Sequence, residues 1–119
     1  MNIETLQKYC LSKKGTSEDM PFDEETIAYR VGGKIFLLTG LENIPLRFNA
    51  KCDPEKAIEL REQYPENILP GYHMNKKHWN TLICDDIISD DLIRELIDYS
   101  YELVYSSLKK SVKAEIEGK

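Results

Sequence analysis

The chain has 119 residues and a formal net charge of −5, and 41% of its residues are hydrophobic and 31% charged. This length and composition are typical of a single water-soluble domain that buries its own core. The apolar runs are too short to cross a bilayer, and the first residues lack the basic and apolar regions of a signal peptide, so we expect a cytoplasmic protein with no membrane segment. The three cysteines are widely spaced, which favours free thiols over disulfides.

The first predicted element is a helix over residues 2–14. Asn2 is a favourable N-cap, and apolar residues follow at helical spacing until a lysine pair and a glycine end the pattern. A polar loop is expected over residues 16–25, with Pro21-Phe22 anchoring it to the domain.

Two strands, over residues 26–31 and 34–39, are predicted to form a β-hairpin around Gly32-Gly33. A two-residue turn that suits the twist of a hairpin needs positive φ at both central positions, which glycine adopts at little steric cost. With that turn Tyr29 pairs with Phe36, and both are expected on the core face of the sheet.

A third strand and a second helix come next. Residues 46–51 alternate apolar and polar side chains, which predicts a half-buried strand. Asp53 then stands as an N-cap before Pro54, a residue favoured at the first position of a helix. Pro65 is expected to end that helix.

Residues 70–81 hold both histidines, the single tryptophan and a lysine pair, with no acidic residue. Pro70-Gly71 predicts a turn and residues 79–84 a strand, so Asn75-Lys76-Lys77 is expected at the tip of a second hairpin. Trp79 is expected to pack in the core under the last helix. The alternative is a surface tryptophan that stacks on a nucleic-acid base.

A long amphipathic helix is predicted from the N-cap Ser89 to about residue 108, and residues 111–119 are expected to fray. The element order is then α-β-β-β-α-β-β-α. This order predicts an α+β fold, a two-layer α/β sandwich with the helices on one side of an antiparallel sheet. The residues expected in the core include Ile27, Tyr29, Phe36, Phe48, Leu96 and Leu103.

Four stretches of the sequence carry a resemblance to a known family: residues 31–36, 51–54 with 60–65, 70–81 and 96–104. On these stretches the chain is identified as a member of the MmcQ/YjbR family. The resemblance implies a single domain over residues 1–110 with the α-β3-α-β2-α fold of that family, which is related to secretion-chaperone-like folds. It also implies a "double-wing" interpretation, in which two β-hairpins act as wings in proposed binding of duplex DNA.

The distribution of charge is consistent with a nucleic-acid partner. Residues 26–52 and 67–84 hold six basic residues and one acidic residue, whereas the remainder of the chain is strongly acidic. A basic sheet against acidic helices suits a polyanion, although part of this pattern arises because Asp and Glu are disfavoured in strands. The residues predicted to contact nucleic acid are Arg30, Lys34, Arg47, Lys51, His73, Asn75, Lys76, Lys77, His78 and Asn80.

Metal and enzymatic sites find less support in the sequence. His73 and His78 match no zinc-ligand spacing, so we expect no metal, no cofactor and no catalytic residue. Cys52 precedes a helix start, where a thiol can be activated, but its neighbours alternate as core residues, which favours a buried, inert thiol. We therefore expect a non-enzymatic binding module that binds DNA. The alternatives are an adaptor that binds a protein partner on the exposed face of the sheet and, more remotely, a small-molecule enzyme.

Overall fold

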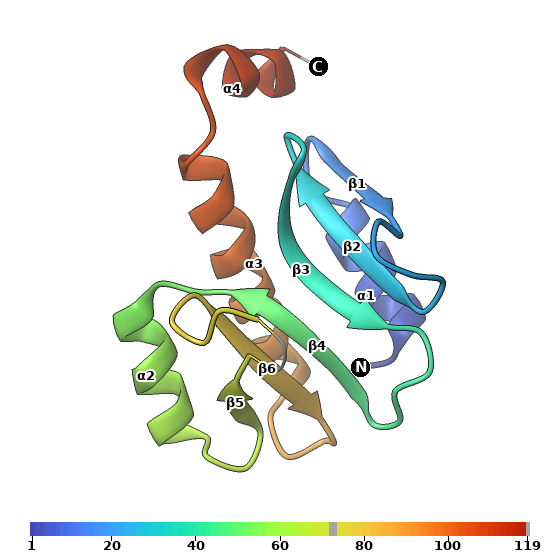
Figure 1. Cartoon of the computed structure of the whole chain (residues 1–119), viewed down its shortest axis with the longest axis vertical. Coiled ribbons are helices and arrows are strands. Elements are labelled where there is room, and N and C mark those ends of the chain that lie inside the picture. Colours follow the sequence, from blue (N-terminus) through green and yellow to red (C-terminus); the bar gives the residue numbers. More distant parts are fainter. Residues whose placement is uncertain (72–73, 119) are drawn as a thin grey trace.

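In the computed structural model, which describes residues 1–71 and 74–118, six strands form one antiparallel sheet in the order β1-β2-β3-β4-β6-β5 (Figure 1). The strands are β1 (Thr16–Asp19), β2 (Thr26–Val31), β3 (Lys34–Gly40), β4 (Leu46–Lys51), β5 (Ile68–Pro70) and β6 (Trp79–Cys84). The helices are α1 (Ile3–Leu11), α2 (Pro54–Gln63), α3 (Asp90–Ser106) and α4 (Lys110–Glu117). The predicted α+β fold is confirmed.

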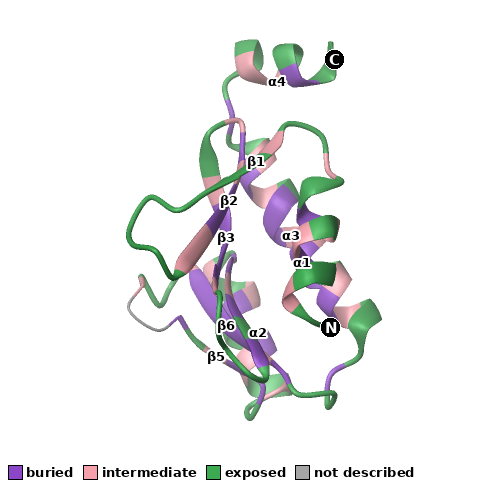
Figure 2. Cartoon of the chain, turned by 90° about the vertical axis from the view of Figure 1, so that its right-hand side faces the viewer, coloured by how far each residue is buried: buried purple, intermediate pink, exposed green. Residues whose placement is uncertain are grey.

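The sheet has one covered face and one open face. Seen along the sheet, α1 and α3 lie on the same side (Figure 2). The strand register places the other set of alternate side chains on the opposite side, which no helix of the described residues covers. We call this side the open face, and it carries Ala28, Arg30, Leu38, Arg47, Asn49, Lys51, Trp79 and Thr81.

The hydrophobic core lies between the covered face and the helices. Phe36 packs edge-to-face on Tyr101 of α3, with 5.7 Å between the ring centroids. Of the residues expected in the core, four are buried, namely Tyr29, Phe36, Phe48 and Leu96. Ile27 and Leu103 are only half-buried, which corrects that part of the prediction.

The β2–β3 hairpin starts in the predicted register and then departs from it. Val31 pairs with Lys34 and Arg30 with Ile35, but a β-bulge follows and Tyr29 pairs with Leu37 instead of Phe36. The extra residue allows both Phe36 and Leu37 to be buried in the core cluster. The predicted pairing of Tyr29 with Phe36 is therefore wrong, although both side chains lie in the core as expected.

The turn at Gly32-Gly33 has the predicted backbone. Both glycines have positive φ, 56° at Gly32 and 86° at Gly33. A Cβ at Gly33 would meet nothing within 4 Å, whereas a Cβ at Gly32 would come within 2.8 Å of Leu108 and 3.0 Å of Val112. The turn therefore faces open space at Gly33 and packs on Leu108 and Val112, near the C-terminus, at Gly32.

The helix starts follow their capping residues. Asn2 Oδ1 accepts the Thr5 N–H at 2.8 Å, and Ser89 Oγ accepts the Leu92 N–H at 3.1 Å. Asp53 accepts two N–H groups of the first turn of α2, each at 3.2 Å. These bonds satisfy backbone donors that have no partner within the helix, which confirms the predicted caps.

Two elements were not expected. Residues 16–19, predicted in a polar loop, form the edge strand β1, and residues 111–117 of the predicted fraying tail belong to α4. Ile116 of α4 is 8% exposed and lies directly on Gly15, where an added Cβ would come within 2.8 Å of its side chain. α4 is therefore attached to the loop before β1 by apolar packing.

Candidate functional site

The predicted basic residues do not form one continuous surface. Arg30, Arg47 and Lys51 lie on the open face. Lys34 pairs with Val31, whose side chain belongs to the covered face, and so lies on the other side of the sheet. The expectation of one basic face built from all of these residues is wrong.

Arg30 is engaged by neighbours within the protein. Its Nε donates to Asp19 Oδ1 at 2.9 Å, and its Nη1 donates to the Gly33 carbonyl at 2.9 Å. Asp19 belongs to β1, the strand that the sequence did not predict. β1 thus brings the carboxylate of Asp19 onto the open face. This carboxylate neutralises the charge of Arg30, one of the residues predicted to contact nucleic acid.

The loop between β5 and β6 presents two lysines that belong to no ion pair among the described residues. Lys76 and Lys77 are exposed, and Asn75 Oδ1 accepts the Lys77 N–H at 2.9 Å. His78 is half-buried, and its carbonyl accepts the Cys52 N–H at 2.7 Å. His73 lies outside the described residues.

Trp79 and Asn80 are both buried, on opposite sides of β6. Trp79 lies on the open face beneath Lys51, whose Nζ is 5.1 Å from the ring centroid, so its predicted place under the last helix is wrong. Asn80 Nδ2 donates to the Ala57 carbonyl of α2 at 3.3 Å. Asn80 is 1% exposed and therefore cannot contact nucleic acid, contrary to the prediction.

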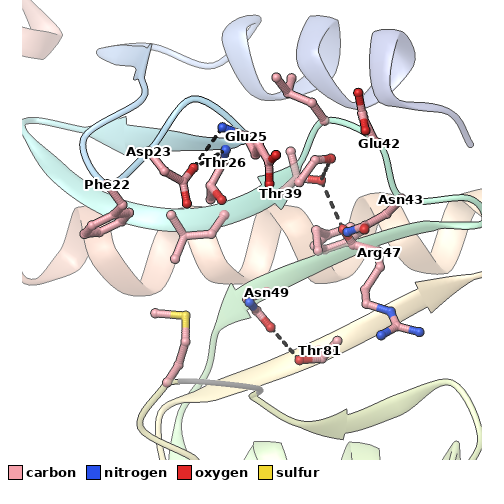
Figure 3. Close-up of a pocket in the computed structure, with 15 residues that line it drawn as sticks. Phe22, Asp23, Glu25, Thr26, Thr39, Glu42, Asn43, Arg47, Asn49 and Thr81 are labelled. Carbon is pink, nitrogen blue, oxygen red and sulfur yellow. Dashed lines mark hydrogen bonds between the residues drawn. The ribbon is translucent and has the colours of Figure 1, made fainter.

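A hollow lies on the open face, lined by loops and strands of the described structure. It is a cavity of about 700 Å³ between the loop before β2, the loop after β3 and the centre of β4 and β6 (Figure 3). Leu38 forms part of its floor together with Asn49 and Thr81, whose side chains are joined by a hydrogen bond. Phe22, 65% exposed, stands at its edge, and Met74 also lines it.

Local hydrogen bonds hold the walls of the cavity. Asp23 Oδ1 accepts the N–H groups of Glu25 and Thr26, each at 2.8 Å, and so turns the chain into β2. The same bonds, that from Glu25 first, lower the pKa of Asp23. On the opposite strand, Thr39 Oγ1 donates to the Arg47 carbonyl at 3.0 Å.

The cavity has one apolar and two polar side chains at its floor, an apolar edge and acidic side chains around its mouth. Three carboxylates line it, from Asp23, Glu25 and Glu42, against one guanidinium, from Arg47. Glu25, Glu42 and Arg47 are exposed, and among the described residues none of the three belongs to an ion pair. This arrangement can bind an apolar group at the floor and a charged group at the rim.

The three cysteines are free thiols buried away from this cavity. Burial raises the pKa of Cys52 to about 11 and the pKa values of Cys10 and Cys84 to about 12. Cys52 is therefore the inert thiol that the sequence favoured. In the part of the chain that the structure describes, no group of three or more His, Cys, Asp or Glu side chains is placed to hold a metal ion.

Sequence reasoning missed the cavity because its lining comes from five separate segments of the chain. One local signal was present: Phe22 is the single aromatic residue in a mostly polar segment, residues 16–25. The predicted role of Phe22 as an anchor for the loop is wrong, because the residue is 65% exposed at the edge of the cavity. Among the described helices, none is long and apolar enough to span a bilayer.

Residues 11–103 match the family model described as YjbR. The chain is 40% identical over 108 residues to uncharacterized protein YbdF of Escherichia coli O157:H7, covering 90% of this chain and 87% of YbdF. It is 44% identical over 115 residues to uncharacterized protein YyaQ of Bacillus subtilis (strain 168), covering 84% of this chain and 95% of YyaQ.

Two solved structures share the fold. The crystal structure of Deinococcus radiodurans protein DR2400 matches with a TM-score of 0.91 at 36% sequence identity, covering 98% of this chain and 88% of that one. A crystal structure of a protein from Pseudomonas syringae matches with a TM-score of 0.69 at 25% identity, covering 87% of this chain and 98% of that one.

Proposed function

The chain belongs to the YjbR family, and we propose that it is a non-enzymatic binding module that takes a protein partner on the open face of its sheet. The cavity on that face carries the proposal. An antiparallel sheet with one face away from the core usually turns polar side chains to water. Here the cavity on the uncovered face is lined in part by apolar side chains, those of Phe22, Leu38, Leu41 and Met74.

A protein partner suits the edge of the cavity better than a nucleic acid does. Phe22 and Leu41 both line the cavity and are 65% and 41% exposed. Exposed apolar side chains grouped around a hollow are typical of protein–protein contact sites. The carboxylates of Glu25 and Glu42 at the same mouth would repel a phosphate backbone.

The distribution of reactive groups supports binding without chemistry. The thiols are buried with raised pKa values, and His78 does not line the cavity. The lining instead supplies carboxylates, amides, hydroxyls, a guanidinium and apolar groups, which suit recognition. We also place the protein in the cytoplasm, where free thiols persist. Cell fractionation with an antibody to this chain tests that assignment.

A peptide selection tests the proposed binding site. Its negative control is a variant in which a larger side chain fills the cavity. A random peptide library displayed on phage is selected on the wild-type protein, and each enriched clone is then measured against Thr26→Trp. Thr26 lines the cavity, and its N–H bond to Asp23 survives the substitution. We expect the enriched clones to lose binding to Thr26→Trp.

A second variant protects the test against misfolding of the first. Phe22→Ser removes an exposed ring from the edge of the cavity and should leave the fold intact, which the circular dichroism melting curve checks. The matched control is Ile58→Ser, another exposed apolar residue, on α2 and outside the cavity. No enrichment on the wild type, or equal binding to all variants, would refute the proposed site.

Duplex DNA is the second candidate ligand, on a different surface. Lys76 and Lys77 are exposed at the tip of the β5–β6 loop, and Lys51 lies at its base, opposite Trp79. Three lysines at one end of the sheet suit the phosphate backbone, which needs charge and little base-specific geometry. Of the two hairpins predicted to act as wings, the β5–β6 hairpin carries exposed lysines in its loop. The turn of the β2–β3 hairpin, Gly32-Gly33, packs on Leu108 instead.

The DNA candidate is tested by the salt dependence of binding. Fluorescence anisotropy with a labelled duplex is measured over a series of salt concentrations for the wild type and for Lys76→Ala/Lys77→Ala. Loss of two phosphate contacts should flatten the slope of log affinity against log salt by about 1.8. Lys109→Ala/Lys110→Ala removes the same charge from exposed residues beside α4 and should keep the slope. Absence of salt-dependent binding by the wild type would eliminate DNA as the ligand.

A further inference from the structure

The charge at the mouth of the open-face cavity is unbalanced. Figure 3 shows Asp23, Glu25 and Glu42 along one side of the cavity and Arg47 on the other. Asp23 is already occupied, because its carboxylate accepts two backbone N–H groups. Glu25 and Glu42 are exposed and, among the described residues, belong to no ion pair, so two carboxylates remain for a ligand.

The apolar part of the cavity lies next to these carboxylates. Leu38 is buried although no helix of the described chain covers it, Phe22 stands at the edge, and Met74 also lines the cavity. An aliphatic side chain placed there would shield its own surface and the exposed side chain of Phe22 from water. A ligand that fills the site therefore combines an apolar group with a neighbouring positive charge.

We propose that the occupant of the cavity is a segment of a partner protein in which a lysine or arginine lies beside an aliphatic side chain. This inference rests on the proposed function and names the chemistry of the partner. The aliphatic side chain packs on Leu38 between Phe22 and Met74, and the cation lies at Glu25 and Glu42.

Arg47 gives the segment its direction. A guanidinium repels the partner's cation and attracts carbonyl and carboxylate oxygens. The basic side chain therefore lies at the Glu25 and Glu42 side, and carbonyl groups of the segment lie at the Arg47 side. An acidic or phosphorylated segment would place its charge against two unpaired carboxylates, and complementarity disfavours it.

The test uses three short labelled peptides with the same glycine–serine flanks and the central sequences Leu-Lys-Leu, Leu-Glu-Leu and Ser-Lys-Ser. Binding to the wild-type protein is measured by fluorescence anisotropy at low and high salt. We expect Leu-Lys-Leu to bind most tightly. The exchange of lysine for glutamate should weaken binding roughly tenfold at low salt, and less at high salt, because attraction becomes repulsion and salt screens both.

Two double variants test whether the carboxylates at the cavity, and not the overall charge of the protein, attract the peptide. Glu25→Gln/Glu42→Gln should weaken binding of Leu-Lys-Leu about 3- to 10-fold, as expected for the loss of two solvent-exposed ion pairs. Glu59→Gln/Glu62→Gln makes the same charge change on exposed residues of α2, away from the cavity, and should leave the affinity nearly unchanged.

The outcomes distinguish this inference from the function on which it rests. If Leu-Glu-Leu binds as well as Leu-Lys-Leu, or the two glutamine pairs behave alike, the basic segment is wrong. The proposed function survives that result as long as Phe22→Ser weakens the binding of apolar peptides. If Phe22→Ser and Thr26→Trp leave every peptide unaffected, the proposed function itself is wrong.

Discussion

The glycine pair between β2 and β3 allows the packing of the C-terminal segment to be measured with two matched substitutions. Gly32→Ala and Gly33→Ala each add one methyl group at a position with positive φ. The methyl group at Gly33 would point into open space, whereas the methyl group at Gly32 would come within 2.8 Å of Leu108 and 3.0 Å of Val112. The difference between the two variants therefore reports the contact and not the backbone.

The two free energies can be estimated separately. Alanine in the left-handed region costs about 1–2 kcal/mol, and the smaller entropy of the unfolded chain returns about 0.4–1 kcal/mol, so Gly33→Ala should destabilise by about 1 kcal/mol. Gly32→Ala adds overpacking, which costs about 1–3 kcal/mol. Leu108 can rotate away, but the β-branched Val112 is stiff, so we expect about 2–3 kcal/mol in total for Gly32→Ala.

Urea unfolding followed by the fluorescence of Trp79, the single tryptophan, measures both variants. With a slope of about 1–2 kcal/mol per molar urea, the midpoint of Gly32→Ala should lie roughly 0.5–2 M below that of Gly33→Ala. In a Leu108→Ala background the gap should shrink, because the crowded side chain has been removed. Equal midpoints for the two variants would show that the α3–α4 junction does not pack on the turn.

Three further predictions concern the core, the thiols and α4. Phe48→Ala should destabilise the protein by about 3–5 kcal/mol in urea unfolding, because the ring is 1% exposed; a loss below about 1 kcal/mol would contradict its place in the core. The free energy of unfolding should fall as the pH rises from about 8.5 toward 12, because the thiols ionise in the unfolded chain while burial keeps Cys10 and Cys84 protonated in the folded protein. The dependence of this free energy on pH should be shallower in Cys10→Ala. An unchanged pH dependence in that variant would argue against the burial of the Cys10 thiol. Ile116→Ala should speed amide hydrogen exchange in α4 while leaving α3 protected, since the contact with Gly15 attaches α4 to the rest of the domain; equal loss of protection in both helices would mean that they unfold as one unit.

Local signals in the sequence were sufficient wherever one residue determines the backbone around it. Asn2, Asp53 and Ser89 cap their helices as predicted, and the two glycines make the expected turn. In each case a short side chain, or the absence of one, acts within three residues of its own position.

Features that depend on distant segments were not predictable in the same way. Thr16–Asp19 has no apolar alternation, and its place as β1 comes from backbone pairing with β2. The bulge depends on how Phe36 and Leu37 fill the core, which the hairpin pattern does not contain. α4 left a weak signal, Val112 and Ile116 at helical spacing, but its stability depends on glycines far away in the chain.

The candidate site shows the same division. The exposure of Lys76 and Lys77 followed from their place in a loop, and it is confirmed. The neutralisation of Arg30 by Asp19 required knowledge of β1, and the burial of Asn80 required the position of α2. Counting charges along strands therefore overestimated the basic surface.

The order of the strands also bears on how the protein resists aggregation. The two edges of the sheet are its two shortest strands, β1 with four residues and β5 with three. β1 carries two acidic residues, and β5 ends in Pro70, which has no N–H to donate to a neighbouring chain. Short, charged or proline-containing edges give a foreign strand little to pair with. β3, the longest strand and a mostly apolar one, lies in the interior of the sheet, so the edges of the described structure offer little template for cross-β growth in a concentrated solution.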